Sequence, residues 1–360
     1  MCIRDRNTVF GDRVRLDFQS SFTGKDKLHT RLAAGNLAAF NLNGSAEGTQ
    51  TFNLTGTNNT SNGFGLDWLA YEFPWGKNAQ IYVAATGGLF ADIAPTLNPY
   101  FDGGDGGNGA LSVFAQNNPI YRLGGGAGAG IRYNFGSTGT FMPSSLTLAY
   151  LADKANSPAQ GEGLFNGDYA ALAQLTFNLG DSFQLAGTYV NSYHSTTNAL
   201  FDAGGGSGIT GTSFANDPTP GPIQGNSYGL QAAWRVSDKL SVSAFGGTTF
   251  ARGMTSGTDS NIWYYGGGLA FPDLGKKGNL GGIFVGVEPY LAGQRTIAGG
   301  TNTLTSATPV DTSLHIEGFY KYNLSDNVSI TPGIVWINAP NQNENNKDAV
   351  IGTLRTTFSF

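Results

Sequence analysis

Side-chain polarity alternates with a period of two residues along most of this 360-residue chain. Within residues 10–22, for example, the apolar side chains of Leu16 and Phe18 share one face. The charged side chains of Arg15 and Asp17 share the other face. Because successive side chains of a β-strand point to opposite sides, this pattern predicts strands with one apolar and one polar face. Comparable segments are 10–22, 28–34, 64–75, 80–90, 127–135, 146–151, 169–179, 183–193, 228–236, 240–250, 263–271, 283–291, 314–324, 328–337 and 354–360.

The connections between these segments alternate between long polar loops and tight turns. The tight turns are expected at 24–27, 76–79, 180–181, 237–238 and 325–327. Long extracellular loops and short periplasmic turns are typical of bacterial outer-membrane barrels. We therefore predict an all-β fold, a transmembrane antiparallel β-barrel with about fifteen strands present. Such barrels have an even number of strands, and the first segment runs into a periplasmic turn, so we infer sixteen strands in the intact barrel.

The composition fits strands that have one face in lipid. Charged residues make up only 12% of the chain, and 54 residues are glycine. No run of ~18 apolar residues is present, so we expect no transmembrane helix. A soluble β-sandwich is the alternative, but it gives no reason for connections of alternating length. The net charge of −5 argues against nucleic acid as a partner, and the single cysteine, Cys2, excludes an internal disulfide.

Aromatic residues recur at two levels of the predicted outer face. Tyr169 and Phe177 lie eight residues apart on one segment, as do Trp263 and Phe271 on another. At ~3.3 Å per residue and a tilt of ~40°, this spacing corresponds to roughly 20 Å along the membrane normal. Two aromatic girdles on either side of an apolar band are typical of transmembrane barrels.

The stretch 100–132 differs from the rest of the chain. It begins as an acidic, glycine-rich loop and ends in a glycine- and alanine-rich strand. We expect this third extracellular loop to fold into the mouth of the barrel and to set the width and charge of a pore. A sixteen-stranded barrel is wide enough for an aqueous channel. The glycines of 124–130 lack the spacing of a dinucleotide fingerprint, and we expect them to let the loop approach the wall.

The candidate pore-lining and constriction residues carry charges of both signs. They are Arg13, Arg15, Asp17, Arg31, Asp102, Asp105, Arg122, Arg132 and Arg355. The hypothesis is a basic strip of wall facing an acidic loop, because rings of fixed charge set the selectivity of a channel. In the alternative, the arginines only satisfy neighbouring carboxylates and loop carbonyls, and both roles can hold together.

No signal for catalysis or for a resident metal is strong. Ser227 lies in a Gly-x-Ser-x-Gly pattern, but a strand rather than a helix follows it, so we expect no enzyme. His315 and Glu317 share a face and with His29 could hold a metal transiently, yet two histidines on distant strands are a weak metal signal. We expect a solvated lumen at these residues, and no metal or other cofactor.

Two segments carry a family resemblance. VFGDRVRLDFQSSFTGKDKLHTRLAAGN (9–36) and NPIYRLGGGAGAGIRYNF (118–135) resemble cyanobacterial outer-membrane porins often labelled iron uptake porins, which are relatives of the carbohydrate-selective (OprB-like) porins. The terminal Phe360 is similar to the end signal of outer-membrane barrels. The resemblance implies a homotrimeric porin, surrounded by outer-membrane lipid, for passive diffusion of small solutes. Inorganic ions including iron, and sugars, are the implied permeants.

The resemblance also sets expectations for the domains. It covers residues 7–360 as a porin barrel, and we expect residues 1–6 to be a non-native or disordered leader. Family members usually carry a signal peptide, a surface-layer-homology domain and a first strand ahead of this region, so we expect an N-terminally truncated sequence. Peptidoglycan or another cell-wall polymer is then a partner only through the missing domain. A non-conducting structural or adhesive barrel remains the alternative, which a plugged lumen would favour.

Overall fold

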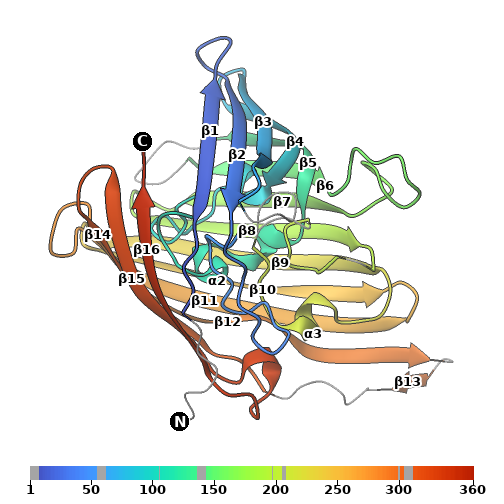
Figure 1. Cartoon of the computed structure of the whole chain (residues 1–360). Coiled ribbons are helices and arrows are strands. Elements are labelled where there is room, and N and C mark those ends of the chain that lie inside the picture. The colour runs from blue at the N-terminus through green and yellow to red at the C-terminus, as the bar shows by residue number, and fades with distance from the viewer. Residues whose placement is uncertain are drawn as a thin grey trace.

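In the computed structural model, the chain forms one strongly curved antiparallel sheet whose fifteen main strands pair in sequence order (Figure 1). The structure describes residues 8–54, 62–104, 106–135, 143–196, 198–204, 208–298, 301–303 and 311–360. The strands are β1 (Arg13–Ser20), β2 (Lys27–Gly35), β3 (Gly65–Trp75), β4 (Ala79–Leu89), β5 (Gly125–Asn134), β6 (Ser145–Ala152), β7 (Tyr169–Asn178), β8 (Phe183–His194), β9 (Ile223–Ser237), β10 (Leu240–Gly253), β11 (Thr258–Pro272), β12 (Leu280–Ala298), β13 (Thr301–Thr303), β14 (His315–Asn323), β15 (Val328–Ile337) and β16 (Ala349–Phe358). Fifteen of them form the path β1 to β16, and β13 pairs only with β12. The predicted all-β fold is therefore confirmed.

The turns at one end of the sheet are tight, as the sequence predicts. In the turn between β1 and β2, the Asp26 carboxylate accepts hydrogen bonds from the backbone N–H groups of Thr23 (2.7 Å) and Phe22 (3.1 Å). Gly24 takes a positive φ of 76° there, which costs a glycine nothing. One loop at the opposite end contradicts the expected length pattern, because only residues 254–257 separate β10 from β11.

That difference has a physical cause in β11. Residues 258–261 are polar and look like a loop in the sequence, yet Asp259, Ser260 and Asn261 continue the ladder of β11 with β10, and Thr258 pairs with Thr296 of β12. Thr258 and Ser260 point inward and are buried against the loops that fill the interior. Polar residues are therefore compatible with a strand here because their partners are other interior polar groups, such as the Gln294 side chain, which donates to Ser260 Oγ at 3.2 Å.

The outer face of the sheet is apolar and rich in aromatic residues. Leu230 and Leu354 are 65% and 71% exposed there. Tyr150, Tyr169 and Tyr193 stack across the neighbouring strands β6, β7 and β8, with centroid separations of 5.6 and 6.3 Å. This arrangement fits an aromatic girdle next to a lipid-facing band. Among the described residues, no helix is long and apolar enough to cross a membrane.

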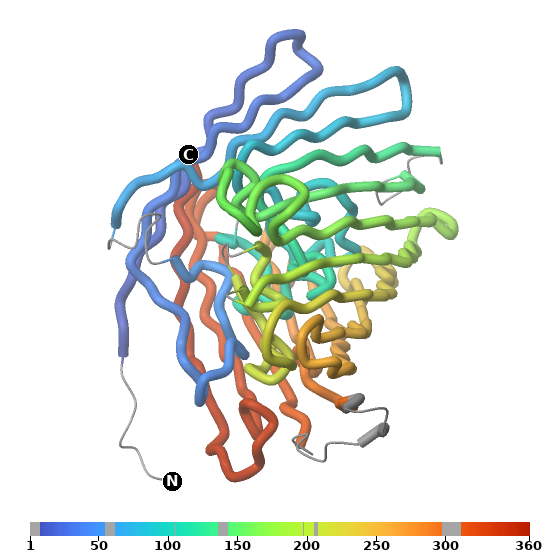
Figure 2. Tube along the Cα trace, turned by 90° about the vertical axis from the view of Figure 1, so that its right-hand side faces the viewer, coloured from blue at the N-terminus to red at the C-terminus, as the bar shows by residue number. Residues whose placement is uncertain are grey.

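The end strands β1 and β16 approach one another without forming a ladder in the described residues. Figure 2, turned by 90°, again places the end of β16 beside the N-terminal strands. A Cβ atom at Gly106 would lie 3.0 Å from the guanidinium of Arg13 on β1, and Arg355 on β16 donates to the Gly106 carbonyl at 3.3 Å. The sheet thus encloses an interior like that of a porin but is not closed by strand pairing. A sixteenth strand stays a prediction.

Short helices occur only in the loops of the described chain, and several pack inside the curve of the sheet. They are α1 (Phe90–Ile93), α2 (Val113–Gln116), η1 (Pro119–Arg122), α3 (Ser213–Asn216) and η2 (Pro340–Gln342). The largest buried cluster of apolar side chains combines residues of α1 and η1 with inward-facing residues of the wall. The interior is therefore occupied by loops rather than left as an unobstructed lumen.

Candidate functional site: the infolded loop and the polar hollow

The connection between β4 and β5, residues 90–124, crosses the interior of the sheet, and we call it the infolded loop. The ring of Phe114 makes edge contacts with Phe245 of β10 (5.5 Å) and Phe284 of β12 (5.4 Å). Phe101 makes a similar contact with Phe284 at 5.7 Å. Such edge-to-face pairs add to the stabilisation from burying the rings themselves. The expectation that this loop folds into the barrel is confirmed.

Glycines of the wall make room for these side chains. A Cβ atom at Gly268 would overlap the Phe101 ring, and one at Gly333 would overlap Leu111. On the strand that follows the infolded loop, a Cβ at Gly130 would lie 2.8 Å from Ile93 of α1. The small residues of 124–130 thus permit close approach to the wall, as expected.

Polar contacts hold the side of the infolded loop that faces β7 and β9. The hydroxyl of Tyr121 donates to Gln174 Oε1 of β7 at 2.6 Å and accepts a hydrogen bond from Gln231 Nε2 of β9. Gln174 Nε2 in turn donates to the carbonyl of Pro95 at 2.8 Å. The loop is therefore attached to widely separated parts of the wall, and its position is determined by both apolar and polar contacts.

A polar cavity of about 90 Å³ remains between the infolded loop and the wall formed by β1 and β2. We call it the polar hollow. Its charged and amide lining comprises Arg15 and Arg31 from the wall, Asp92, Asp102, Gln116, Asn117 and Arg122 from the infolded loop, and Gln50 and Asn53 from the loop between β2 and β3. Four of the predicted pore-lining residues thus meet around one cavity. Their role in permeation stays a prediction.

The wall side of the polar hollow is basic. Arg31 Nε lies 2.6 Å from Asp67 Oδ2, and Arg15 Nε lies 3.4 Å from the same atom. The Arg31 guanidinium also lies 5.0 Å from the centroid of the Trp68 ring. Two guanidinium groups share one carboxylate, so these three side chains carry an excess positive charge beside the cavity.

The side of the polar hollow that the infolded loop forms carries both positive and negative side chains. Asp102 accepts hydrogen bonds from Thr96 Oγ1 (2.6 Å) and Gln116 Nε2 (3.0 Å). Gln116 Oε1 accepts from Arg122 Nη2 at 3.3 Å, and Arg122 Nη1 donates to the carbonyl of Gly208 at 2.8 Å. Burial lowers the pKa of Arg122 to about 10, partly opposed by the charge of Asp102. Arg122 therefore remains a cation at neutral pH.

Asp92 is a lining residue that sequence reasoning did not identify. Its carboxylate accepts hydrogen bonds from the backbone N–H of Leu89 (2.9 Å) and from the Tyr82 hydroxyl (3.3 Å). Burial raises the pKa of Asp92 to about 6, although the Leu89 N–H and the charge of Arg31 oppose the rise. No local pattern marks this residue, because its burial comes from the folding of a loop against distant strands.

Two predicted residues bind loop carbonyls at the seam between the end strands. Arg13 Nη1 donates to the carbonyl of Thr51 at 2.7 Å. Arg355 donates to the carbonyls of Gly109 (2.8 Å) and Ala110 (3.1 Å). These contacts match the alternative in which arginines satisfy loop carbonyls, whereas Arg15 and Arg31 lie beside the cavity.

The remaining predicted residues lie elsewhere. Arg132 Nη1 is 3.4 Å from the carbonyl of Ile93, at the base of α1. Asp17 pairs with His29 at 3.1 Å, on a part of β1 that is open to solvent. Asp105 lies outside the described residues. The sequence pattern therefore predicts which charged side chains lie on the inward face. It does not distinguish the side chains that line the cavity from those that bind loop carbonyls.

The expectation of a solvated lumen at His315 and Glu317 is wrong. These side chains are 1% and 0% exposed, because the infolded loop covers them. His29 does not share their environment and stacks on Trp68 at a centroid distance of 4.2 Å. Within the part of the chain that the structure describes, no group of three or more His, Cys, Asp or Glu side chains could hold a metal ion.

Comparison with known proteins agrees with this architecture. The chain is 50% identical over 366 residues to an uncharacterized protein of Nostoc sp. (98% of this chain, 61% of the relative). It is 34% identical over 374 residues to an uncharacterized protein of Synechocystis sp. (98% and 64%). The chain thus spans about six-tenths of the length of these curated relatives.

Solved porins share the fold at low sequence identity. Pseudomonas putida OprB superposes with a TM-score of 0.57 at 11% identity, covering 97% of this chain and 88% of that chain. An anion-selective porin from Comamonas acidovorans gives a TM-score of 0.50 at 10% identity (96% and 85%). Residues 4–360 match the family described as carbohydrate-selective porin, OprB family. The chain therefore belongs to the OprB family of carbohydrate-selective porins, and its place is the outer membrane of a Gram-negative type of cell.

Proposed function

We propose that this chain forms a channel for the passive diffusion of small polar solutes across the outer membrane, with no enzymatic role. The observation that carries the proposal is the polar hollow, which is lined by guanidinium, carboxylate and amide groups in an interior otherwise filled by loop contacts. Charged and hydrogen-bonding groups at a narrow part of a pore select permeants by size and charge.

Sugars are the first class of permeant in this proposal. The side-chain amides of Gln116 and Asn117 offer both donors and acceptors, and Arg15 and Arg31 offer planar donors. This set matches a solute that carries many hydroxyl groups, and the family description names carbohydrates. Inorganic ions, including iron, are a second class, and they rest on the resemblance in sequence alone.

A homotrimer is the proposed assembly. The outer face of the sheet exposes an apolar surface that includes Leu230, Trp234 and Leu354. A structural neighbour, the Vibrio cholerae outer-membrane protein OmpT, is described in a trimer form, with a TM-score of 0.51 at 6% identity over 96% of this chain and 88% of that chain. Cross-linking of the folded protein in detergent should give a ladder that ends at the trimer. A single band at the mass of the monomer would contradict this assembly.

Planar-bilayer recording and liposome swelling test the channel. We expect discrete conductance steps, together with swelling rates that fall as the permeating sugar becomes larger. A reversal potential in a salt gradient gives the ion preference, and swelling in ferric chelates tests iron as a permeant. Correctly folded protein that neither conducts nor admits sugars would overturn the proposal.

A non-conducting structural or adhesive barrel is the second candidate. It is favoured by the described parts of the loops 36–64, 90–124 and 195–222, because each of them makes hydrogen bonds to inward-facing side chains of the wall. The same recording separates the two candidates, since a plugged barrel gives no conductance steps at any voltage that the bilayer tolerates.

A further inference from the structure

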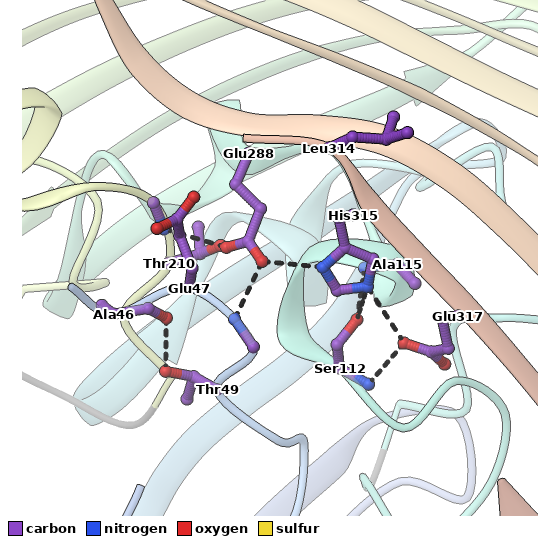
Figure 3. Close-up of polar contacts among 12 residues, drawn as sticks. Ala46, Glu47, Thr49, Ser112, Ala115, Thr210, Glu288, Leu314, His315 and Glu317 are labelled. Carbon is purple, nitrogen blue, oxygen red and sulfur yellow. Dashed lines mark hydrogen bonds and ion pairs between the residues drawn. The ribbon is translucent and has the colours of Figure 1, made fainter. Parts of the chain in front are cut away.

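A carboxylate on β14 binds the backbone of the infolded loop. Glu317 accepts a hydrogen bond from the N–H of Leu111 at 2.6 Å. It accepts another from the N–H of Ser112 at 3.0 Å, just before α2 (Figure 3). The Ser112 hydroxyl caps this short helix by accepting from Ala115 N at 3.1 Å. Bonds from neutral N–H groups to an ionised carboxylate are shorter and stronger than neutral pairs. Glu317 therefore anchors the middle of the infolded loop.

A second carboxylate, on the neighbouring strand β12, binds two other loops. Glu288 accepts from Gly48 N at 2.9 Å, in the loop between β2 and β3. It also accepts from Thr210 Oγ1 (2.6 Å) and from Gly211 N (3.1 Å), in the loop between β8 and β9. One side chain thus ties together segments that are far apart in the sequence.

His315 lies between these two carboxylates, as Figure 3 shows. Its Nδ1 is 2.8 Å from Glu288 Oε1, and its Nε2 is 3.6 Å from Glu317 Oε2 and 3.4 Å from Ser112 Oγ. The exposed fractions of Glu288, His315 and Glu317 are 2%, 1% and 0%. Two carboxylates at such depth need a compensating charge, which an imidazolium with a donor on each nitrogen supplies. We call these three residues the His315 hub.

We propose that the His315 hub is the latch that holds the three loops across the interior as one unit and thereby determines the width of the permeation path. The inference rests on the proposed channel function. Glu288, His315 and Glu317 act as positioning residues, because they contact loop backbone rather than the polar hollow. Removing one member leaves a buried charge without its partner, which destabilises the arrangement far more than the loss of a surface ion pair.

Glu47 lies beside the latch, because it directly precedes Gly48, whose N–H donates to Glu288 at 2.9 Å. It lies in the loop between β2 and β3, where it accepts from Ser45 Oγ and Asn341 N, each at 2.6 Å. Burial, followed by the charge of Glu288, raises the pKa of Glu47 above its ordinary value. The charged group that acts on Glu47 is Glu288 of β12, which in turn contacts His315 of β14. The neighbouring Thr210 and Asn341 are neutral. As pH rises and Glu47 ionises, its repulsion from Glu288 weakens the latch.

The test compares Glu317→Gln and His315→Gln with His29→Gln. His29 is a matched control, since it is also a buried histidine between carboxylates, Asp17 at 3.1 Å and Glu72 at 3.8 Å. We expect the two hub variants to show a larger single-channel conductance and a higher size limit for polyethylene glycols. We also expect hydrogen exchange at the Leu111 and Ser112 amides to accelerate at least about tenfold, with no change in the control. After correction for the intrinsic base-catalysed rate, these amides should lose protection in the wild type as pH rises, and Glu47→Gln should remove that loss of protection.

Folding is checked by circular dichroism and by heat-modifiable migration in gels. If Glu317→Gln does not fold, Ser112→Ala carries the test, because it removes a neutral hydroxyl that contacts His315 and leaves the three charged residues of the hub in place. A folded hub variant with unchanged exchange and unchanged size limit would overturn the latch. A wild type that does not conduct would overturn the channel instead, while the exchange measurement still decides about the latch.

Discussion

Replacing Phe114 by alanine should loosen the infolded loop without disturbing the strands. The Phe114 side chain is 1% exposed, and its ring lies 5.4–5.5 Å from the rings of Phe245, Phe284 and His315. Truncation of a buried phenylalanine costs about 3–5 kcal/mol. No backbone hydrogen bond between wall strands involves this residue, because it lies in α2 rather than in the sheet.

This loss of free energy should therefore mainly weaken the docking of the infolded loop against the wall. Since ~1.4 kcal/mol corresponds to a factor of ten, 3–5 kcal/mol shifts the docking equilibrium by about two to four orders of magnitude. In a planar bilayer, Phe114→Ala should show noisier open-channel current and a higher conductance than the wild type. Phe177→Ala is the matched control, because Phe177 is 42% exposed on the outer face of β7. Folded Phe114→Ala protein with the conductance, noise and size limit of the wild type would refute the reasoning.

The remaining predictions concern the charges in the interior and the packing of the infolded loop against the wall. Replacing Arg13, Arg15 and Arg31 together by alanine should shift the reversal potential toward cation preference. Arg235→Ala should not, because Arg235 lies near the end of β9 and pairs with Asp238 of the following turn at 2.6 Å. An unshifted potential in the triple variant would remove the basic-strip hypothesis. Cation preference should rise as pH increases through about 6 and Asp92 ionises in the polar hollow, and Asp92→Asn should flatten this dependence in salt-gradient recordings. Because the pKa of Asp92 is raised in the folded state, its contribution to stability is fully present below its ordinary value of 3.8 and is lost as pH rises through about 6. Only the part of this window above pH 5 separates urea unfolding at pH 5 from that at pH 8, so the wild type should lose about 1.4 kcal/mol between them and Asp92→Asn should not. Gly333→Val should push Leu111 away from the wall and destabilise the protein by about 1–3 kcal/mol, while Gly352→Val, where a Cβ meets nothing within 4 Å, should have little effect on the urea midpoint; equal midpoints for the two variants would contradict the packing argument.

Much of the wall could be predicted from local sequence. A strand needs only the alternation of its own side chains, so the polarity of residues such as Leu16, Asp17 and Phe18 identifies β1 directly. The turn at Gly24 is equally local, because the Asp26 carboxylate binds residues within the same turn. The sequence by itself therefore determines the approximate positions of the fifteen main strands, their inward and outward faces and most of the tight turns, but not the short connection 254–257 between β10 and β11.

The contents of the interior could not be predicted in the same way. Leu111 N and Glu317 lie 206 positions apart in the chain, and Gly48 N and Glu288 lie 240 positions apart. No periodic pattern relates such residues, since they meet only after the sheet has curved and the loops have folded inward. Only the tertiary structure decides that Arg15 and Arg31 face a cavity, that Arg355 holds loop carbonyls, and that His315 is buried between carboxylates. The physical reason is that strand formation depends on neighbours in sequence, whereas burial and charge pairing inside the barrel depend on which distant loop covers each residue.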